Sequence, residues 1–178
     1  SVESTFGPLR LLPIDLNILE QTGVMDFFMD AVRYFIIQCK CQTMPFEVNE
    51  VQQENWLTEM VQMWVVSQLP GEYLPMHTHW PQSQISAVMY LKVPKVLPSR
   101  KEHKQDNDGS ILFVSNASRD IELSQPSISI PPKVGDFYIF GAHQQHEVYP
   151  FRCEEGQEDT ERRSISFNAF FQPKTAPV

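Results

Sequence analysis

The chain has 178 residues, of which 42% are hydrophobic and 20% charged, and its net charge is −8. This length fits one domain with a full core, and this composition excludes an intrinsically disordered chain. The acidic balance, with no basic run longer than the pair Arg162-Arg163, argues against binding to a nucleic-acid backbone.

Membrane and export signals are not expected. No stretch approaches about 18 consecutive apolar residues, and the first residues lack the basic-then-apolar pattern of a signal peptide. The three cysteines, Cys39, Cys41 and Cys153, are odd in number, and the first two are too close for a loop-closing disulfide. This usage favours a reducing compartment. We therefore expect a cytoplasmic protein without membrane association, and the sequence leaves its oligomeric state open.

The first sixty residues carry helical patterns. Between Thr22 and about Lys40 the apolar residues recur at spacings of three and four, which places them on one face of a helix. A second, weaker helical pattern covers residues 47–59. We expect the first helix to buttress a sheet through Met25, Phe28, Met29, Val32, Phe35 and Ile36.

From Val61 onward the sequence changes to short β-branched and aromatic runs, separated by Pro, Gly and Asn, which is typical of strands. About eight such strands predict a sandwich or a jelly roll. We expect a single domain over residues 1–178, mainly β with α: a helical amino-terminal part over 1–60 and a double-stranded β-helix (jelly-roll) core over 61–172. The expected strands are Val61–Leu69, Tyr73–His79, Ile85–Val93, Ser110–Val114, Ser127–Ile130, Asp136–Phe140, His146–Tyr149 and Arg162–Phe171.

Two polar stretches, residues 99–108 and 153–161, interrupt these strands. Loops of this length are candidate lids over a binding site. Their composition fits plain solvated surface equally well, so the sequence leaves both roles open.

Two of the five histidines, His77 and His79, lie two positions apart inside an expected strand. Side chains at positions i and i+2 of a strand point to the same face, so both imidazoles can address one ion. A lone buried histidine is usually a hydrogen-bonded core residue. Two on one strand face are harder to explain in that way, and we favour a metal site.

A third candidate ligand lies between residues 135 and 148, where an apolar strand breaks at Gly141 and resumes at His146. A jelly roll brings sequence-distant strands side by side, so His146 can complete a three-nitrogen face with His77 and His79. Such a face leaves positions open on a first-row metal ion, as oxygen activation requires. His143 is the alternative ligand, but its place at the broken strand end favours His146.

Strand alternation lets only one of the arginines at 162 and 163 face the barrel interior. An inward guanidinium beside hydroxyl groups binds a carboxylate through two charge-assisted hydrogen bonds. Without an anion to bind, it would need an Asp or Glu partner, which is the structural alternative. One face carries Arg162, Ser164, Ser166 and Asn168, and the other carries Arg163, Ile165 and Phe167.

Together and in this order, the three clusters resemble the Fe(II)- and 2-oxoglutarate-dependent oxygenases, and most of all a branch found in marine bacteria and phages. That branch has a His-x-His-Pro-like segment followed by a Ser-Gly-Val-Tyr-Tyr-Leu-like strand, matched here from His77 to Leu91. Its Gly-Asp-x-x-x-Phe-Pro-Ser-x-x-x-His-x-Val segment is matched by Gly135–Val148, with Gly and Ala in place of Pro and Ser. Its Arg-Ile-Ser-Ile-Ser-Phe-Asn ending is matched by Arg162–Asn168.

The resemblance covers about Trp64 to Phe171 and has two departures. The commonest triad of the superfamily is His-x-Asp with a distal His, whereas this chain has His79 where Asp would stand. The sixteen-residue interval from His146 to Arg162 is also longer than usual, because an acidic loop is inserted there.

The resemblance implies an Fe(II) site formed by His77, His79 and His146. It further implies that 2-oxoglutarate chelates the iron and that its far carboxylate meets Arg162, rather than Arg163, with Ser164 and Tyr90 as hydrogen-bond partners. The implied activity is that of a dioxygenase, which releases succinate and carbon dioxide and usually hydroxylates its substrate. Here the cofactors supply the chemistry and the protein supplies the geometry.

Two other functions fit parts of the pattern. A three-histidine cupin-type oxygenase without 2-oxoglutarate explains the histidines but gives Arg162 no task. A non-catalytic jelly-roll module that binds a metal or another ligand has the same fold, because fold alone does not decide function. The substrate class, a small molecule or a peptide side chain, is not selected by any residue.

Overall fold

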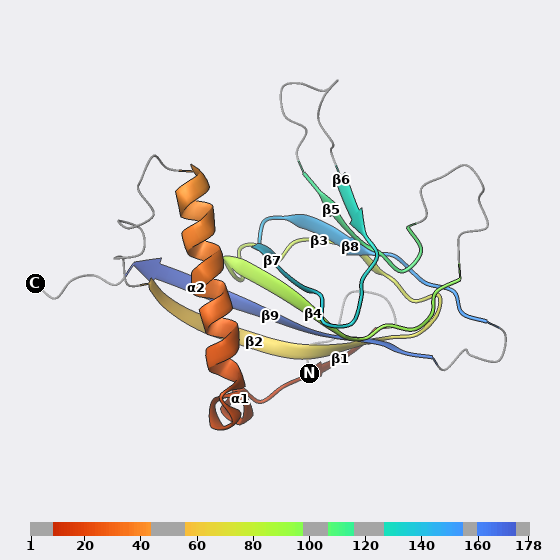
Figure 1. The fold of residues 1–178 in the computed structure, drawn as a ribbon, viewed down its shortest axis with the longest axis horizontal. Helices are drawn as coiled ribbons and strands as arrows, with labels where there is room; N and C mark the ends of the chain where they lie inside the picture. Colours follow the sequence, from red (N-terminus) through yellow and green to blue (C-terminus); the bar gives the residue numbers. More distant parts are fainter. Residues whose placement is uncertain (1–8, 44–55, 98–106, 116–126, 155–159, 174–178) are drawn as a thin grey trace, which may run out of the picture.

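Two antiparallel sheets and two helices make up the part of the chain that this computed structural model describes, residues 9–43, 56–97, 107–115, 127–154 and 160–173 (Figure 1). One sheet has the strand order β1-β2-β9-β4-β7 and the other β3-β8-β5-β6. Strands distant in sequence are neighbours in both sheets, so the prediction of a mainly β jelly roll is confirmed. The strands are β1 (Arg10–Pro13), β2 (Trp56–Gln68), β3 (Leu74–His77), β4 (Ile85–Lys92), β5 (Ile111–Val114), β6 (Ser127–Ile130), β7 (Phe137–Gly141), β8 (Gln145–Val148) and β9 (Arg162–Pro173).

The helix layer buttresses the five-stranded sheet, as the periodicity predicts for the longer helix. Helix α1 (Leu16–Thr22) begins after Asp15, whose side chain accepts from the N–H of Asn17, and it ends at Gly23 in the left-handed conformation, with φ 72°. Helix α2 (Val24–Thr43) then crosses β2 and β9 (Figure 1). The helix expected from Thr22 to Lys40 is therefore confirmed. Its buried face consists of Phe28, Met29, Val32 and Ile36.

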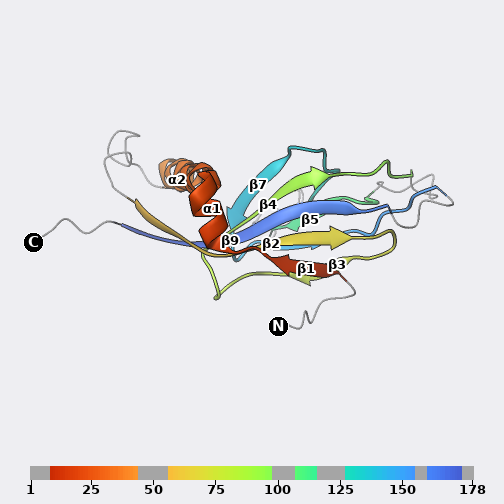
Figure 2. The ribbon, with the colours of Figure 1, turned by 90° about the horizontal axis from the view of Figure 1, so that it is seen from below.

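The five-stranded sheet separates two apolar layers by strand alternation. Its outer face packs on α2 through residues such as Ile85 and Phe167, and its inner face contributes Val88 and Tyr90 to the jelly-roll interior. Burying a side chain such as Phe167 is worth about 1.5–3 kcal/mol, so the helix layer stabilises the sheet that carries the inner face. Figure 2 shows both helices on one side of the strands, with β1 and β3 on the other.

A β-bulge in β2 explains one error of the sequence analysis. The register with β9 shifts between Met60 and Gln62, so one extra residue enters the strand and the alternation changes phase. The buried positions Trp56, Met60 and Met63 are consequently spaced by four and three, as on a helix. The helical pattern over 47–59 is wrong for residues 56–59, which are strand; residues 47–55 lie outside the described ranges.

The other expected strands agree with the structure to within a few residues at each end, and β6 agrees at both ends. Strand β1 and helix α1 were not predicted, and β2 begins at Trp56, before the expected start of the core at residue 61. Of the two candidate lids, residues 99–106 and 155–159 lie outside the described ranges, so their role stays a prediction. Neither described helix has the length and apolar character that crossing a membrane requires.

Candidate active site

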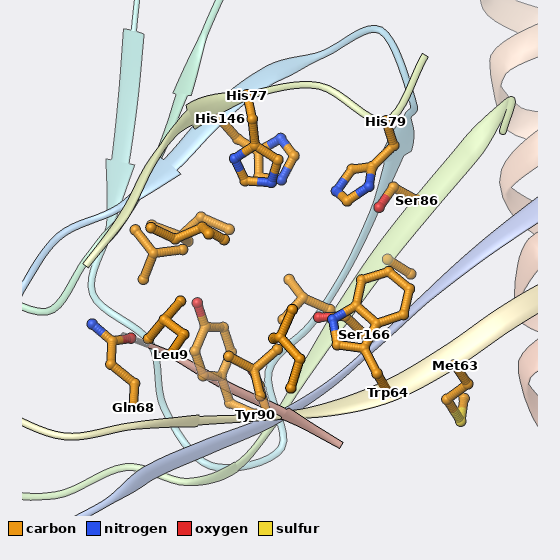
Figure 3. A pocket seen from close by; sticks show the side chains of 18 of the residues that line it. Leu9, Met63, Trp64, Gln68, His77, His79, Ser86, Tyr90, His146 and Ser166 are labelled. Carbon is orange, nitrogen blue, oxygen red and sulfur yellow. The ribbon is translucent and has the colours of Figure 1, made fainter. Parts of the chain in front are cut away.

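Three histidine rings meet in the interior of the jelly roll. His77, the last residue of β3, lies opposite His146 of β8 in the ladder, and their ring centroids are 4.2 Å apart. The ring centroid of His79 is 5.1 Å from that of His77 and 5.3 Å from that of His146. One ligand nitrogen from each residue lies within 4.8 Å of the others. Figure 3 shows the three rings along one wall of a cavity.

The expectation that His79 belongs to the same strand as His77 is wrong, because β3 ends at His77. The chain turns instead, and the backbone N–H groups of His79 and Trp80 both donate to the carbonyl of Ala142, at 2.8 and 3.2 Å. These bonds tie the segment to the turn between β7 and β8. They hold His79 beside the other two rings by a route that strand alternation does not predict.

Backbone carbonyls orient two of the three rings. The Nδ1 atom of His77 lies 2.7 Å from the carbonyl oxygen of Pro75, and that of His146 lies 3.0 Å from the carbonyl oxygen of Gln144. A carbonyl only accepts, so Nδ1 carries the proton and the lone pair lies on Nε2. Ligating histidines in proteins are usually held in this way, with one ring N–H donated to a neighbouring acceptor.

Burial keeps the three imidazoles neutral. It lowers the pKa of His77, lowers that of His79 to about 4, and lowers that of His146 to about 3, in the last two cases with a further contribution from the His77 charge. All three rings are therefore in the ligand-ready form at neutral pH. Three clustered neutral imidazole nitrogens are a donor set that suits Fe(II) and related first-row ions.

His143, the alternative ligand, does not join this cluster. It is exposed, and its ring lies against Gly141, where a Cβ atom would stand 2.6 Å from the ring. Among the described residues, the group with metal-ligand spacing contains His146 and not His143.

The cavity below the histidines has a volume of about 600 Å³. Its walls come from both sheets, and Figure 3 shows Tyr90, Trp64 and Gln68 across the cavity from the histidine rings. Among the described lining residues, Arg162 carries the one permanent charge. The apolar part of the lining includes Leu9, Leu11, Pro13, Trp64, Val66, Leu74, Val88, Ile111, Phe140 and Val148.

Arg162, the first residue of β9, faces the interior and is only 3% exposed. Its guanidinium donates to the carbonyl oxygens of Gly109 and Tyr149 and to the side-chain oxygen of Gln68. Among the described residues no carboxylate forms an ion pair with it, so the structural alternative of an internal Asp or Glu partner finds no support there. Arg163 points outward and pairs with Glu161, at 2.7 and 3.0 Å.

Ser164 and Tyr90 line the cavity beside Arg162. The two residues are partners in the β4–β9 ladder, and both are buried. Burial raises the pKa of Tyr90 to about 12, although the nearby Arg162 charge opposes the shift. The phenol is therefore protonated at neutral pH and available as a donor, and Figure 3 shows its hydroxyl directed into the cavity.

Several residues of this site had no role assigned to them from the sequence, although Asn168 was expected on the face of Arg162. Trp64 and Gln68 face the cavity from β2, Gly109 accepts from Arg162, and the Asn168 side-chain nitrogen lies 3.4 Å from Nδ1 of His79. Side chains alternate regularly along β2 after the bulge, and this alternation is the signal that would have identified Trp64 and Gln68. Gly109 has a φ of 74°, and a Cβ there would stand 3.2 Å from Phe151; a lone glycine in a polar segment gave no such signal.

Comparison with known proteins places the chain in a family. The profile of the family described as "Putative 2OG-Fe(II) oxygenase" matches residues 62–168. The chain belongs to this family. The oxygenase is thus an oxidoreductase whose cofactor and cosubstrate are Fe(II) and 2-oxoglutarate, as the resemblance in sequence implied. The matched segment contains all three clustered histidines and Arg162. A search of curated proteins found no match.

Solved structures of similar fold include a Pseudomonas putida prolyl-4-hydroxylase, at 18% identity and TM-score 0.54, covering 98% of this chain and 77% of that one. The viral collagen prolyl hydroxylase vCPH of Paramecium Bursaria Chlorella virus-1 is 14% identical, with TM-score 0.53 and coverage of 95% and 82%. HygX of Streptomyces hygroscopicus, solved with nickel and 2-oxoglutarate, is 13% identical, with TM-score 0.54 and coverage of 94% and 72%. This chain spans 48% of a Burkholderia pseudomallei oxidoreductase of the 2OG-Fe(II) oxygenase family. At these identities the three likenesses with a TM-score above 0.5 show the fold alone, which is again the jelly roll.

Proposed function

We propose that this oxygenase hydroxylates a small molecule or a peptide side chain and converts 2-oxoglutarate to succinate and carbon dioxide. The observation that carries the proposal is that one cavity is lined both by three neutral histidines and by a buried arginine without a described carboxylate partner. A keto acid with a second, distant carboxylate requires a metal site and an anion site in one cavity. A three-histidine site alone would not require Arg162.

The proposed roles follow from the position of each side chain. His77, His79 and His146 hold Fe(II) through ring nitrogens. Arg162 binds the far carboxylate of 2-oxoglutarate, and the hydroxyls of Ser164 and Tyr90 donate to it. With both groups bound, the site supplies the oxidation of a substrate C–H bond by dioxygen. The apolar walls exclude water, which strengthens the contact between Arg162 and the carboxylate.

Binding of 2-oxoglutarate to the Fe(II)-loaded protein tests this function directly. We expect a weak visible charge-transfer band when both are mixed without oxygen. We then expect succinate formation above uncoupled turnover in a substrate screen that includes proline-containing peptides, since two similar folds are prolyl hydroxylases. Oxygen consumption with neither the band nor succinate would favour the cupin-type oxygenase. Consumption of neither oxygen nor 2-oxoglutarate would favour a binding module.

The ligand role of His79 has its own test, because this residue stands where Asp is usual in the superfamily. We expect His79→Asp to retain metal binding, since a carboxylate at this position can replace the imidazole, and His79→Ala to lose it. Iron content and 2-oxoglutarate turnover are measured for both variants. If His79→Ala keeps both iron and turnover, the third ligand lies elsewhere.

The remaining parts of the proposal concern location and partners. We propose a cytoplasmic enzyme, on the odd number and close spacing of its cysteines. The net charge of −8 argues against nucleic acid as a partner.

A further inference from the structure

Gln68 is the side chain that joins β2 to the guanidinium of Arg162. It is 2% exposed, and it is the ladder partner of Arg162 in the β2–β9 pair. Its side-chain oxygen accepts from Nη2 of Arg162. A buried amide and a buried guanidinium thus meet at the end of the cavity where we place the anion site.

The amide of Gln68 is fixed in one orientation. Its nitrogen donates to the backbone carbonyls of Glu72 and, at 3.4 Å, Tyr149. Two carbonyls on the nitrogen side require the NH₂ group there, so the oxygen must face Arg162. The carboxylate of Glu72, the nearest acid in sequence, accepts from the N–H of Leu69 at 2.7 Å instead.

Every described acceptor on Arg162 is uncharged. Gly109 and Tyr149 offer backbone carbonyls and Gln68 offers an amide. These three bonds use three of the five N–H donors of a guanidinium. They orient the group but leave its full positive charge, whereas buried charges in proteins are usually paired with an opposite one.

We propose that Gln68 is a positioning residue for the cosubstrate: it holds the guanidinium of Arg162 in place without neutralising it, so that the charge is reserved for the incoming carboxylate. This inference rests on the proposed function of Arg162. By this inference the side chain at position 68 must be uncharged as well as of the right shape. A residue that only packs would need the shape alone.

The substitution Gln68→Glu tests the requirement for neutrality, because it changes charge and scarcely changes size. The introduced carboxylate is expected to pair with Arg162 and to compete with 2-oxoglutarate. We expect the dissociation constant of 2-oxoglutarate, measured by calorimetry on the anaerobic Fe(II)-loaded protein, to rise about 100-fold, the range of a lost buried charge contact. KM for 2-oxoglutarate should rise while kcat changes little. The variant also places a carboxylate oxygen against the carbonyls of Glu72 and Tyr149, to which the amide nitrogen donates in the parent, so thermal unfolding is measured only to verify that the variant is folded.

Two further variants serve as controls for this test. Gln68→Met removes the acceptor but leaves the guanidinium charged, so it should lower the melting temperature and weaken 2-oxoglutarate binding less than Gln68→Glu does. Gln62→Glu places the same charge on the same cavity-facing side of β2 and should also cost less affinity. The inference is overturned if Gln68→Glu binds 2-oxoglutarate as tightly as the parent, or if it binds no worse than either control. If the parent itself binds no 2-oxoglutarate, the proposed function fails instead.

Discussion

Replacing His146 with alanine is expected to lower the affinity for Fe(II) by more than about 100-fold, since even the loss of a residue that only orients a ligand costs about 10–100-fold. His146 lies across the ladder from His77, so the variant removes one half of the closest ligand pair. His77→Ala should have the same effect. Calorimetric titration with Co(II), an inert substitute, measures the affinity, and circular dichroism verifies the fold.

His143→Ala is the matched control for this experiment. His143 lies three residues before His146 in sequence, but it is exposed and outside the cluster. We expect this variant to bind metal as the parent does. Equal losses in the two variants, or unchanged binding in His146→Ala, would show that the three histidines are not the metal site.

Replacing Arg162 with alanine is expected to weaken 2-oxoglutarate binding by about 2 to 4 kcal/mol, the cost of truncating one partner of a buried charge pair. The loss is large because Arg162 is 3% exposed, so its contact with a carboxylate is shielded from water and salt. Calorimetry on the Fe(II)-loaded, oxygen-free protein measures the dissociation constant.

Arg163→Ala is the control on the adjacent residue. Arg163 faces outward and pairs with Glu161 at the surface, and such exposed pairs contribute about 0–1 kcal/mol. We expect its variant to keep the parent affinity for 2-oxoglutarate. If both variants lose affinity equally, the cosubstrate does not bind at the inward face of β9.

Strand alternation correctly predicted which face of a regular strand each side chain occupies. Along β9 it placed Arg162 and Ser164 on the inward face and Phe167 on the face that α2 covers. The helix was equally predictable, because Phe28, Val32 and Ile36 recur at a helical period and are buried. In both cases one local period is kept over the whole element, so the local pattern and the packing agree.

Irregular backbone accounts for what the sequence did not predict. The bulge in β2 changes the alternation between Met60 and Gln62, so no single period describes the strand and its first residues were predicted to be helical. His79 reaches the cluster through hydrogen bonds to Ala142, a contact between segments distant in sequence. Local patterns carry no information on such contacts.

The separation of Gln68 from Arg162 by 94 positions has a consequence for folding. The β2–β9 ladder closes a long loop, and loops of this size make folding slow, on the scale of milliseconds to seconds for β-rich domains. Before the ladder forms, Gln68 and Arg162 lie apart, and neither has the hydrogen-bond partners that it has in the native state. The anion site therefore belongs to the native state alone, and a ligand held there stabilises that state by mass action, by about 2.7 kcal/mol at one hundred times its dissociation constant. Binding of 2-oxoglutarate at this site would therefore add to the stability of the enzyme as well as permit turnover.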